Sequence, residues 1–109
     1  MSHSSDDNFV ELILTCSSWQ EAQNIADVLL AKKLIACAEF IESKSKYYWK
    51  NNIEEAKEIT LFMQSKSDLF DEVEKELNEI HSYETFVLRQ IPLSKVSTNA
   101  IKWLRESLN

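Results

Sequence analysis

The sequence predicts a single α+β domain in which helices cover one face of an antiparallel sheet. Segments of alternating apolar and polar residues recur along the chain, and between them lie segments whose apolar residues are three or four positions apart. The two kinds of segment follow the order β-α-β-β-α-β, with one further helix at the end. A chain of 109 residues can bury one small core and has no room for a second.

The first strand and helix are predicted at residues 9–17 and from Ser18 to about Lys33. FVELILTCS alternates well enough for a strand. Ser18 and Glu21 have the spacing of a capping box, so the helix should begin there. The buried stripe of this helix repeats at i, i+3, i+4 and i+7 and consists of Ala22, Ile25, Ala26 and Leu29.

A long hairpin is predicted next. Residues 35–49 are rich in β-favouring types, and residues 53–65 alternate again through Ile59, Leu61 and Met63. The sequence KNN at 50–52 is the best turn between them. Because the chain has no glycine, turn positions with positive φ should fall mainly to Asn or Asp.

The second half repeats the helix-then-strand order. Residues 67–80 form a helix with Ser67 as its cap and a buried face of Phe70, Val73, Leu77 and Ile80. Residues 85–91 form a short strand that Pro92 ends, and a last helix is capped near Ser97. This order is that of a ferredoxin-like βαββαβ sandwich with an extra C-terminal helix. Residues 9–109 make up this one domain, and residues 1–8 are predicted to be a disordered tail.

Charge and cysteine content narrow the classes of partner. The net charge is −6 and no basic block occurs, which argues against nucleic acid and anionic membranes as partners. From the polar start of the sequence and the lack of a long apolar run, we expect neither a signal peptide nor a membrane span. Cys16 and Cys37 lack CxxC spacing, which favours two buried free thiols in a cytoplasmic protein over a disulfide, and we expect Cys37 to face the core beneath the first helix.

The predicted hairpin is longer than the helices that cover the sheet. Fifteen strand residues span roughly 50 Å, whereas a helix of the same number of residues covers only about 22 Å. The uncovered end carries Tyr47, Tyr48, Trp49 and Ile53. The outer sheet face, with Thr60 and Phe62, has no helix of its own either. Such surfaces are more often interfaces than ligand sites, which predicts a closed homo-oligomer.

Catalysis is not expected. Acylphosphatases share this fold and bind phosphate in a glycine-rich loop after the first strand, together with an arginine. The corresponding CSSWQ has neither residue type, and arginine occurs only at positions 89 and 105. The acidic residues between 68 and 79 are typical of a solvent-exposed helix face and not of paired catalytic acids. We therefore assign no catalytic residues.

Four fragments at the right mutual distances resemble the CutA family of divalent-cation tolerance proteins. They are KKLIACAEFI, YYWKNNIEEAKEI, SKSDLFDEVEKELNEIHSYE and IKWL, within a match from about Val10 to Leu108. The resemblance implies a cytoplasmic, non-catalytic homotrimer, similar in architecture to PII signalling proteins, whose long hairpins wrap neighbouring subunits. It also implies a role in the response to copper and other divalent metals, with no fixed cofactor and a ligand cleft between subunits.

That resemblance places the candidate cleft residues in this sequence. They are Trp49, Lys66, His81, Tyr83 and Glu84, with His81 as the candidate metal ligand. The family motif resembles HPYExPEI, whereas this chain has HSYETFVL, so Ser82, Phe86 and Val87 replace two prolines and a glutamate. Thr15 stands where some members have a strand cysteine, with Cys16 one position away.

Two interpretations of HSYE stay open from the sequence. His81 is either a metal ligand, within one subunit or across a trimer, or a residue at the end of a helix, where its partial positive charge is favoured. The alternative to a metal-responsive protein is accordingly a structural or adaptor trimer with a vestigial cleft and no metal binding.

Overall fold

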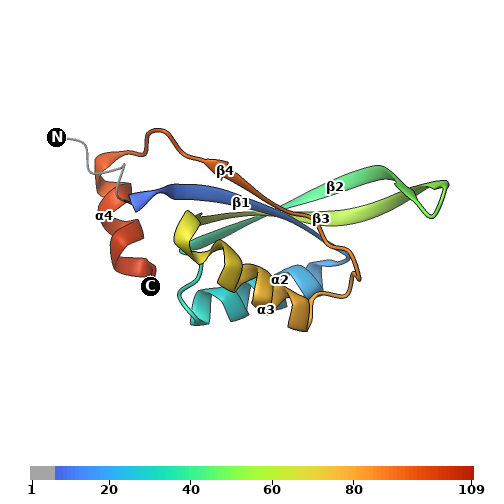
Figure 1. The fold of residues 1–109 in the computed structure, drawn as a ribbon, viewed down its shortest axis with the longest axis horizontal. Coiled ribbons are helices and arrows are strands. Elements are labelled where there is room, and N and C mark those ends of the chain that lie inside the picture. The colour runs from blue at the N-terminus through green and yellow to red at the C-terminus, as the bar shows by residue number, and fades with distance from the viewer. Residues whose placement is uncertain (1–6) are drawn as a thin grey trace.

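The computed structural model describes residues 7–109 and confirms the predicted element order and the ferredoxin-like α+β fold (Figure 1). The elements are β1 Phe9–Cys16, α2 Trp19–Ala31, β2 Cys37–Trp49, β3 Asn52–Lys66, a short 3-10 helix η1 Ser67–Leu69, α3 Phe70–Ile80, β4 Leu88–Pro92 and α4 Thr98–Ser107. The strands form one antiparallel sheet in the order β2-β3-β1-β4. Both halves therefore place their first strand in the centre of the sheet.

Helices α2 and α3 lie side by side under one face of the sheet (Figure 1). Alternate residues of the two central strands point to that face, where Leu12 pairs with Met63 and Leu14 pairs with Leu61. All four are fully buried, as are Ile25, Leu29, Val73 and Leu77 from the helices. The predicted stripe of α2 is confirmed residue by residue.

The C-terminal helix α4 packs at the end of the sheet where β1 begins (Figure 1). Ile101, Leu104 and Leu108 join the core. Of the predicted tail 1–8, residues 1–6 lie outside the described residues, and the last two are bonded to the domain. Arg105 Nη2 lies 2.6 Å from Asp7 Oδ2, and the Asn8 carbonyl accepts from the Ser67 N–H at 2.9 Å.

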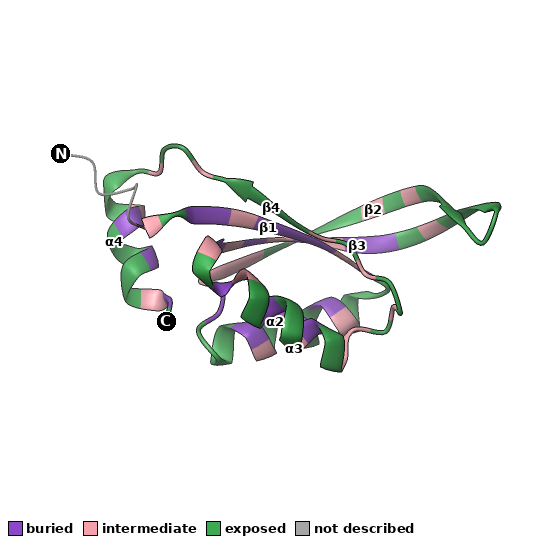
Figure 2. Cartoon of the chain, in the orientation of Figure 1, coloured by how far each residue is buried: buried purple, intermediate pink, exposed green. Residues whose placement is uncertain are grey.

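The hairpin extends well beyond the rest of the sheet. Strand β1 ends at Cys16, opposite Ile59, so seven further residue pairs of β2 and β3 have no third strand beside them among the described residues. We call these segments, residues 43–49 and 52–58, the ribbon. The molecule measures 51 Å along its longest axis but only 25 and 22 Å across. The ribbon tip is exposed (Figure 2). Tyr48 has an exposed fraction of 79% and Ile53 one of 67%.

A turn lies within the predicted residues 50–52, but it is limited to Lys50 and Asn51, because Asn52 begins β3 and pairs with Trp49. Lys50 and Asn51 both have positive φ, as the type I′ hairpin turn requires. Asn8 and Lys33 are the other non-glycine residues with positive φ between residues 7 and 109. Lysine therefore fills half of the four positions, and the expectation that Asn or Asp would mainly fill them was wrong in that respect.

Several boundaries differ from the prediction, among them the starts of β2, β4 and α3. Strand β4 begins at Leu88, not at residue 85, and it includes Pro92. Helix α3 begins at Phe70, after the 3-10 turn, so the Ser67 side chain does not cap it. Ser97 does stand at the N-cap of α4, although without a side-chain cap bond.

Both cysteines are free, as expected. Cys16 is buried, but the prediction for Cys37 was wrong. Cys37 is half-buried and pairs with Gln64, whereas its neighbour Ala38 pairs with the buried Met63. Because successive strand residues point to opposite faces, Cys37 faces away from the helices. None of the helices in residues 7–109 combines the length and hydrophobicity that a membrane crossing needs.

Candidate functional site

The HSYE sequence forms a corner between α3 and the segment leading to β4. His81 is the C-cap of α3, and its N–H donates to the Leu77 carbonyl at 2.8 Å. Its backbone is extended, with φ −78° and ψ 138°, which turns the chain out of the helix. We call residues 81–84 the corner. It lies beside the end of β1 and the start of α2.

The His81 ring is buried, and both of its nitrogens are engaged. Nδ1 accepts from the Tyr83 N–H at 3.0 Å, so the ring proton lies on Nε2, which donates to the Thr15 carbonyl at 2.9 Å. Phe86 stacks on the ring with centroids 5.2 Å apart. In this arrangement His81 fixes the corner against the end of β1 and offers no free lone pair.

Glu21 binds the corner to the first turn of α2. Its Oε1 accepts from the N–H and the hydroxyl of Ser17, at 2.8 and 2.9 Å, and its Oε2 accepts from the Ser82 N–H at 2.6 Å. Burial alone raises the pKa of Glu21, but these hydrogen bonds outweigh it and lower the pKa to about 2. Ser18 caps the helix as predicted, whereas the Glu21 carboxylate bonds Ser17 and Ser82 and not the Ser18 N–H.

Cys16, Glu21 and His81 bring their ligand-type atoms within 4.8 Å of one another. This is a spacing that a metal ion could use. Burial, followed by the charges of Glu21 and Glu58, raises the pKa of Cys16 to about 12, so its thiol stays protonated at neutral pH. With the thiol protonated and both the imidazole and the carboxylate already hydrogen-bonded, the three groups as arranged do not fit an ion.

Tyr83 reaches from the corner to the part of the hairpin where β1 ends, residues 42–43 and 58–59. We call this part the root of the ribbon. Its hydroxyl donates to Glu58 Oε2 at 2.5 Å. Glu58 is only 6% exposed, although it carries a carboxylate. Burial, followed by the bond to this carboxylate, raises the pKa of the Tyr83 phenol well above its usual range, so the phenol remains the donor.

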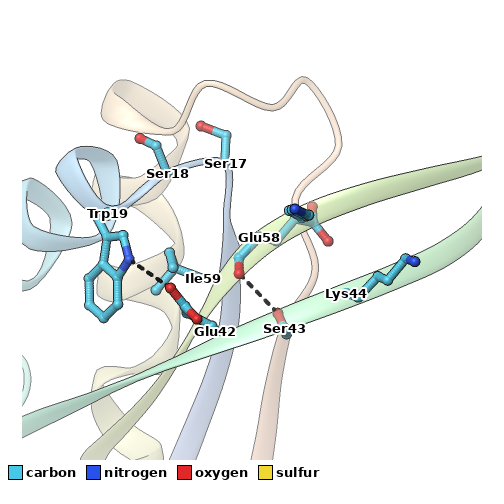
Figure 3. Close-up of a pocket in the computed structure, with 9 residues that line it drawn as sticks. Ser17, Ser18, Trp19, Glu42, Ser43, Lys44, Glu58 and Ile59 are labelled. Atoms are coloured by element: carbon cyan, nitrogen blue, oxygen red, sulfur yellow. Dashed lines mark hydrogen bonds between the residues drawn. The ribbon is translucent and has the colours of Figure 1, made fainter.

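A cavity of about 580 Å³ opens between the start of α2 and the root of the ribbon (Figure 3). Its walls include Ser17, Trp19, Glu42, Lys44, Lys57 and Glu58. Trp19 Nε1 donates to Glu42 Oε2 at 3.4 Å across it. The cavity mixes acidic and basic side chains and therefore has no single preferred ligand charge.

Comparison with known proteins identifies the family of this chain, and the match includes the corner. The model of the CutA1 divalent ion tolerance protein family matches residues 10–107. The chain belongs to the CutA1 family. The divalent-cation tolerance protein CutA of Archaeoglobus fulgidus is 35% identical over 101 residues, which are 93% of this chain and 97% of that protein. CutA of Pyrococcus horikoshii is 33% identical over 92 residues, which are 84% and 90% of the two chains.

Solved CutA structures share this fold over more than nine-tenths of the chain. The structure described as the periplasmic divalent cation tolerance protein CutA of Archaeoglobus fulgidus has a TM-score of 0.90 and 33% identity, and it covers 93% of this chain and 99% of its own. The crystal structure of CutA1 from Pyrococcus horikoshii has a TM-score of 0.87 and 29% identity, over 92% and 98% of the two chains.

The departures from the CutA motif quoted above have structural consequences here. Ser82 supplies the backbone N–H that Glu21 binds, and a proline at this position has no N–H to donate. Phe86 stacks on the His81 ring, and Val87 is exposed. The corner of this CutA chain is therefore held by side-chain bonds where prolines would restrict the backbone.

Within one chain, the five predicted cleft residues do not all meet. His81 and Tyr83 lie together, with ring centroids 5.0 Å apart, and Glu84 follows them as an exposed residue. Lys66 pairs with Phe9 at the opposite end of β1, roughly 20 Å from Thr15 along the strand. Trp49 lies at the ribbon tip, roughly 20 Å beyond Glu58.

The sequence did not predict the hydrogen-bonding roles of two residues of the site, Glu21 and Glu58. Glu21 was interpreted only as a local cap, because nothing in the sequence shows that Ser82, 61 positions away, is its partner. Glu58 was not singled out. Its signal was strand alternation, which places it on the same face as Thr60 and Phe62, the face predicted to lack a helix.

Proposed function

We propose that this protein acts as a homotrimer in the response to divalent cations, copper among them, by binding or signalling at clefts between subunits and not by catalysis. One observation carries the proposal: the ribbon leaves Tyr47, Tyr48, Trp49 and Ile53 exposed beyond the body of its own subunit. Membership of the CutA1 family supports the link with divalent ions.

Burial on a neighbour is the physical reason for assembly. Each large apolar side chain that leaves water contributes about 1.5–3 kcal/mol. The four ribbon residues lie at one tip, with Tyr48 and Ile53 on one face and Tyr47 and Trp49 on the other, so a neighbour that contacts both faces would bury all of them. Identical ribbons on identical subunits favour a closed ring, and a threefold ring uses every ribbon once.

A cleft between subunits accounts for the separation of the predicted site residues. The corner of one chain keeps Glu84 exposed, while Trp49 and Lys66 of the same chain lie far from it. A ribbon from a neighbour would bring a second Trp49 to a body surface. The cleft of the proposal is therefore composite, with the corner from one subunit and the ribbon from another.

A metal ion in this cleft would bind first to the accessible carboxylate of Glu84. Recruiting His81 requires its Nε2 to release the Thr15 carbonyl or its Nδ1 to release the Tyr83 N–H. The complete engagement of the His81 ring favours a second candidate function, in which the trimer is a structural or adaptor protein and binds no metal.

Calorimetry with Cu(II) and Zn(II) distinguishes the two candidates. We expect saturable heat with the wild type, a reduction of at least about tenfold in affinity for Glu84→Gln, and no change for Glu106→Gln. Glu106 on α4 is also an exposed carboxylate, so its variant controls for loss of charge. Absence of saturable heat from the wild type would leave the adaptor function in its place.

Assembly has its own test. Ile53→Lys places a charge on the exposed ribbon, and Leu30→Lys places one on the outer face of α2, where Leu30 is exposed as well. We expect Ile53→Lys to give monomers on a sizing column with light scattering and Leu30→Lys to keep the mass of the wild type. Equal masses for all three proteins would contradict assembly through the ribbon.

We also place the protein in the cytoplasm, on the ground that its two cysteines are free. The solved relative from Archaeoglobus fulgidus is described as periplasmic, so the compartment has to be measured for this chain. Cell fractionation with an antibody to the protein does so, and recovery outside the cytoplasmic fraction would refute this assignment.

A further inference from the structure

The direction of the ribbon depends on contacts at its root. Within the described chain, the backbones of its seven residue pairs have only each other as strand partners, and two-stranded ribbons twist more than wider sheets. Ser43 and Thr60 share a hydroxyl–hydroxyl bond of 2.8 Å, but both belong to the hairpin. Such bonds hold β2 to β3 and do not fix the pair relative to the body.

Two side-chain bonds do join the root to the body, one on each face. Glu42 pairs with the buried Ile59 and therefore points to the helix face, where Trp19 of α2 donates to it at 3.4 Å. Glu58 is the next residue along β3, so it points to the opposite face. There Tyr83 donates to it at 2.5 Å. The root is thus held between α2 and the corner.

The bond from Tyr83 is the stronger of the two. An O–H donor and an ionised carboxylate form the shortest and strongest class of hydrogen bonds, with lengths of about 2.5–2.7 Å. Glu58 is only 6% exposed, so water competes less for its carboxylate than for that of Glu42, which is exposed together with its partner Trp19. No ion pair with Glu58 occurs among residues 7–109, which leaves Tyr83 as the main partner of this carboxylate.

Tyr83 in turn is fixed to the body through the corner. Its own N–H is bonded to His81, and the corner is bonded to Thr15 of β1 and to Glu21 of α2. We infer that Tyr83 and Glu58 are positioning residues: their hydrogen bond sets the direction in which the ribbon leaves its subunit. The inference rests on the proposed assembly only for its consequence, which is that the ribbon points at the correct surface of a neighbour.

The same link couples the corner to assembly. A ligand at Glu84 or His81 changes the surroundings of Tyr83, which lies between them in the sequence. Any resulting shift of the phenol moves Glu58 and so the ribbon. By reciprocity, the docked ribbon favours the corner geometry in which Tyr83 donates to Glu58.

Residual dipolar couplings of backbone amides test the inference on the whole protein. In the wild type, couplings of residues 44–48 and 53–57 should fit the same alignment tensor as those of α2 and α3. In Tyr83→Phe we expect the ribbon couplings to leave that fit and shrink, and the apparent dissociation constant of the assembly to rise by at least about tenfold.

Ser65→Ala is the matched control. Ser65 lies on the same strand, is buried, and donates its hydroxyl to the Leu34 carbonyl at 2.7 Å, but it lies in the body of the sheet. Its loss should lower stability and leave the ribbon couplings in the common fit. Glu58→Gln keeps an acceptor for the Tyr83 hydroxyl and should also retain the wild-type direction.

The inference and the proposed function fail separately. Ribbon couplings in Tyr83→Phe that match those in Ser65→Ala would overturn the positioning role, whatever the oligomeric state. A monomeric wild type would overturn the proposed assembly, while the couplings would still report whether the Tyr83–Glu58 bond orients the ribbon.

Discussion

Glu21 Oε2 accepts a hydrogen bond from the Ser82 N–H at 2.6 Å, which joins the first turn of α2 to the residue after the C-cap of α3. The two residues are 61 positions apart in sequence. This carboxylate also accepts from the N–H and the hydroxyl of Ser17. One acidic side chain therefore fixes the corner, and its protonation should release it.

Glu21→Gln should lower the free energy of unfolding by about 2 kcal/mol at pH 7, and the gap should close under acid. The folded-state pKa is about 2, below the ordinary value of 4.5, so the carboxylate contributes its full stabilisation above about pH 4.5. That stabilisation is lost as the pH falls through the folded-state value. Urea unfolding of both proteins from pH 7 to pH 2 measures it, and a gap that is independent of pH would contradict the assigned bonds.

His81→Ala should cost about 3 kcal/mol of unfolding free energy, with or without metal. The substitution removes a buried ring that bridges Thr15 and Tyr83 and supports Phe86. Glu84→Ala, at the exposed end of the same corner, should change stability by less than about 0.5 kcal/mol. Chemical denaturation of metal-free protein tests both values. Equal, small effects would show that the ring does not hold the corner.

Cys16 should be nearly inert toward a disulfide reagent such as dithionitrobenzoate in the folded protein. Its pKa is raised from 9 to about 12 and its side chain is buried, so the thiolate fraction is about a thousandfold lower than in the unfolded chain. The variant Cys37→Ser isolates this thiol. We expect its rate to keep rising tenfold per pH unit past pH 9, and a plateau there would disprove the raised pKa.

Lys33→Gly should stabilise the protein by about 0.5–1 kcal/mol. Lys33 follows α2 with φ at 58°, a left-handed conformation that costs a side-chain-bearing residue more than it costs glycine. Ala31→Gly, at the last position of α2, should instead destabilise by about 1 kcal/mol. Thermal unfolding of the two variants should therefore shift in opposite directions, and a common direction would be the contrary result.

The spacing of apolar residues predicted most helices and strands, because the residues with that spacing are the ones buried in the core. The buried stripe of α2 and the alternation of β3 both result from contact with the same core. Ser18 was predictable as a cap because its side chain bonds the N–H of Glu21, only three positions along the sequence. The start of β4 was placed too early because residues 85–87 belong to a segment that the fixed corner and the Phe86–His81 stack hold out of the sheet. Local preference carries no information about such partners.

The candidate site was predictable only in part. His81 and Tyr83 were identified through resemblance, and they do lie together. The carboxylates that hold the corner, Glu21 through Ser82 and Glu58 through Tyr83, come from α2 and β3, and each contact spans more than twenty residues of sequence. Whether Trp49 and Lys66 join them depends on a second copy of the chain, which strand and helix periods do not describe.

The most direct test is the mass of the wild-type protein in solution by sedimentation equilibrium. A chain of 12.7 kDa with an apolar ribbon that its own body does not cover should sediment at close to three times that mass at micromolar concentration. A stable single-chain mass over the same range, with the aromatic tip accessible to a fluorescence quencher, would contradict assembly through the ribbon.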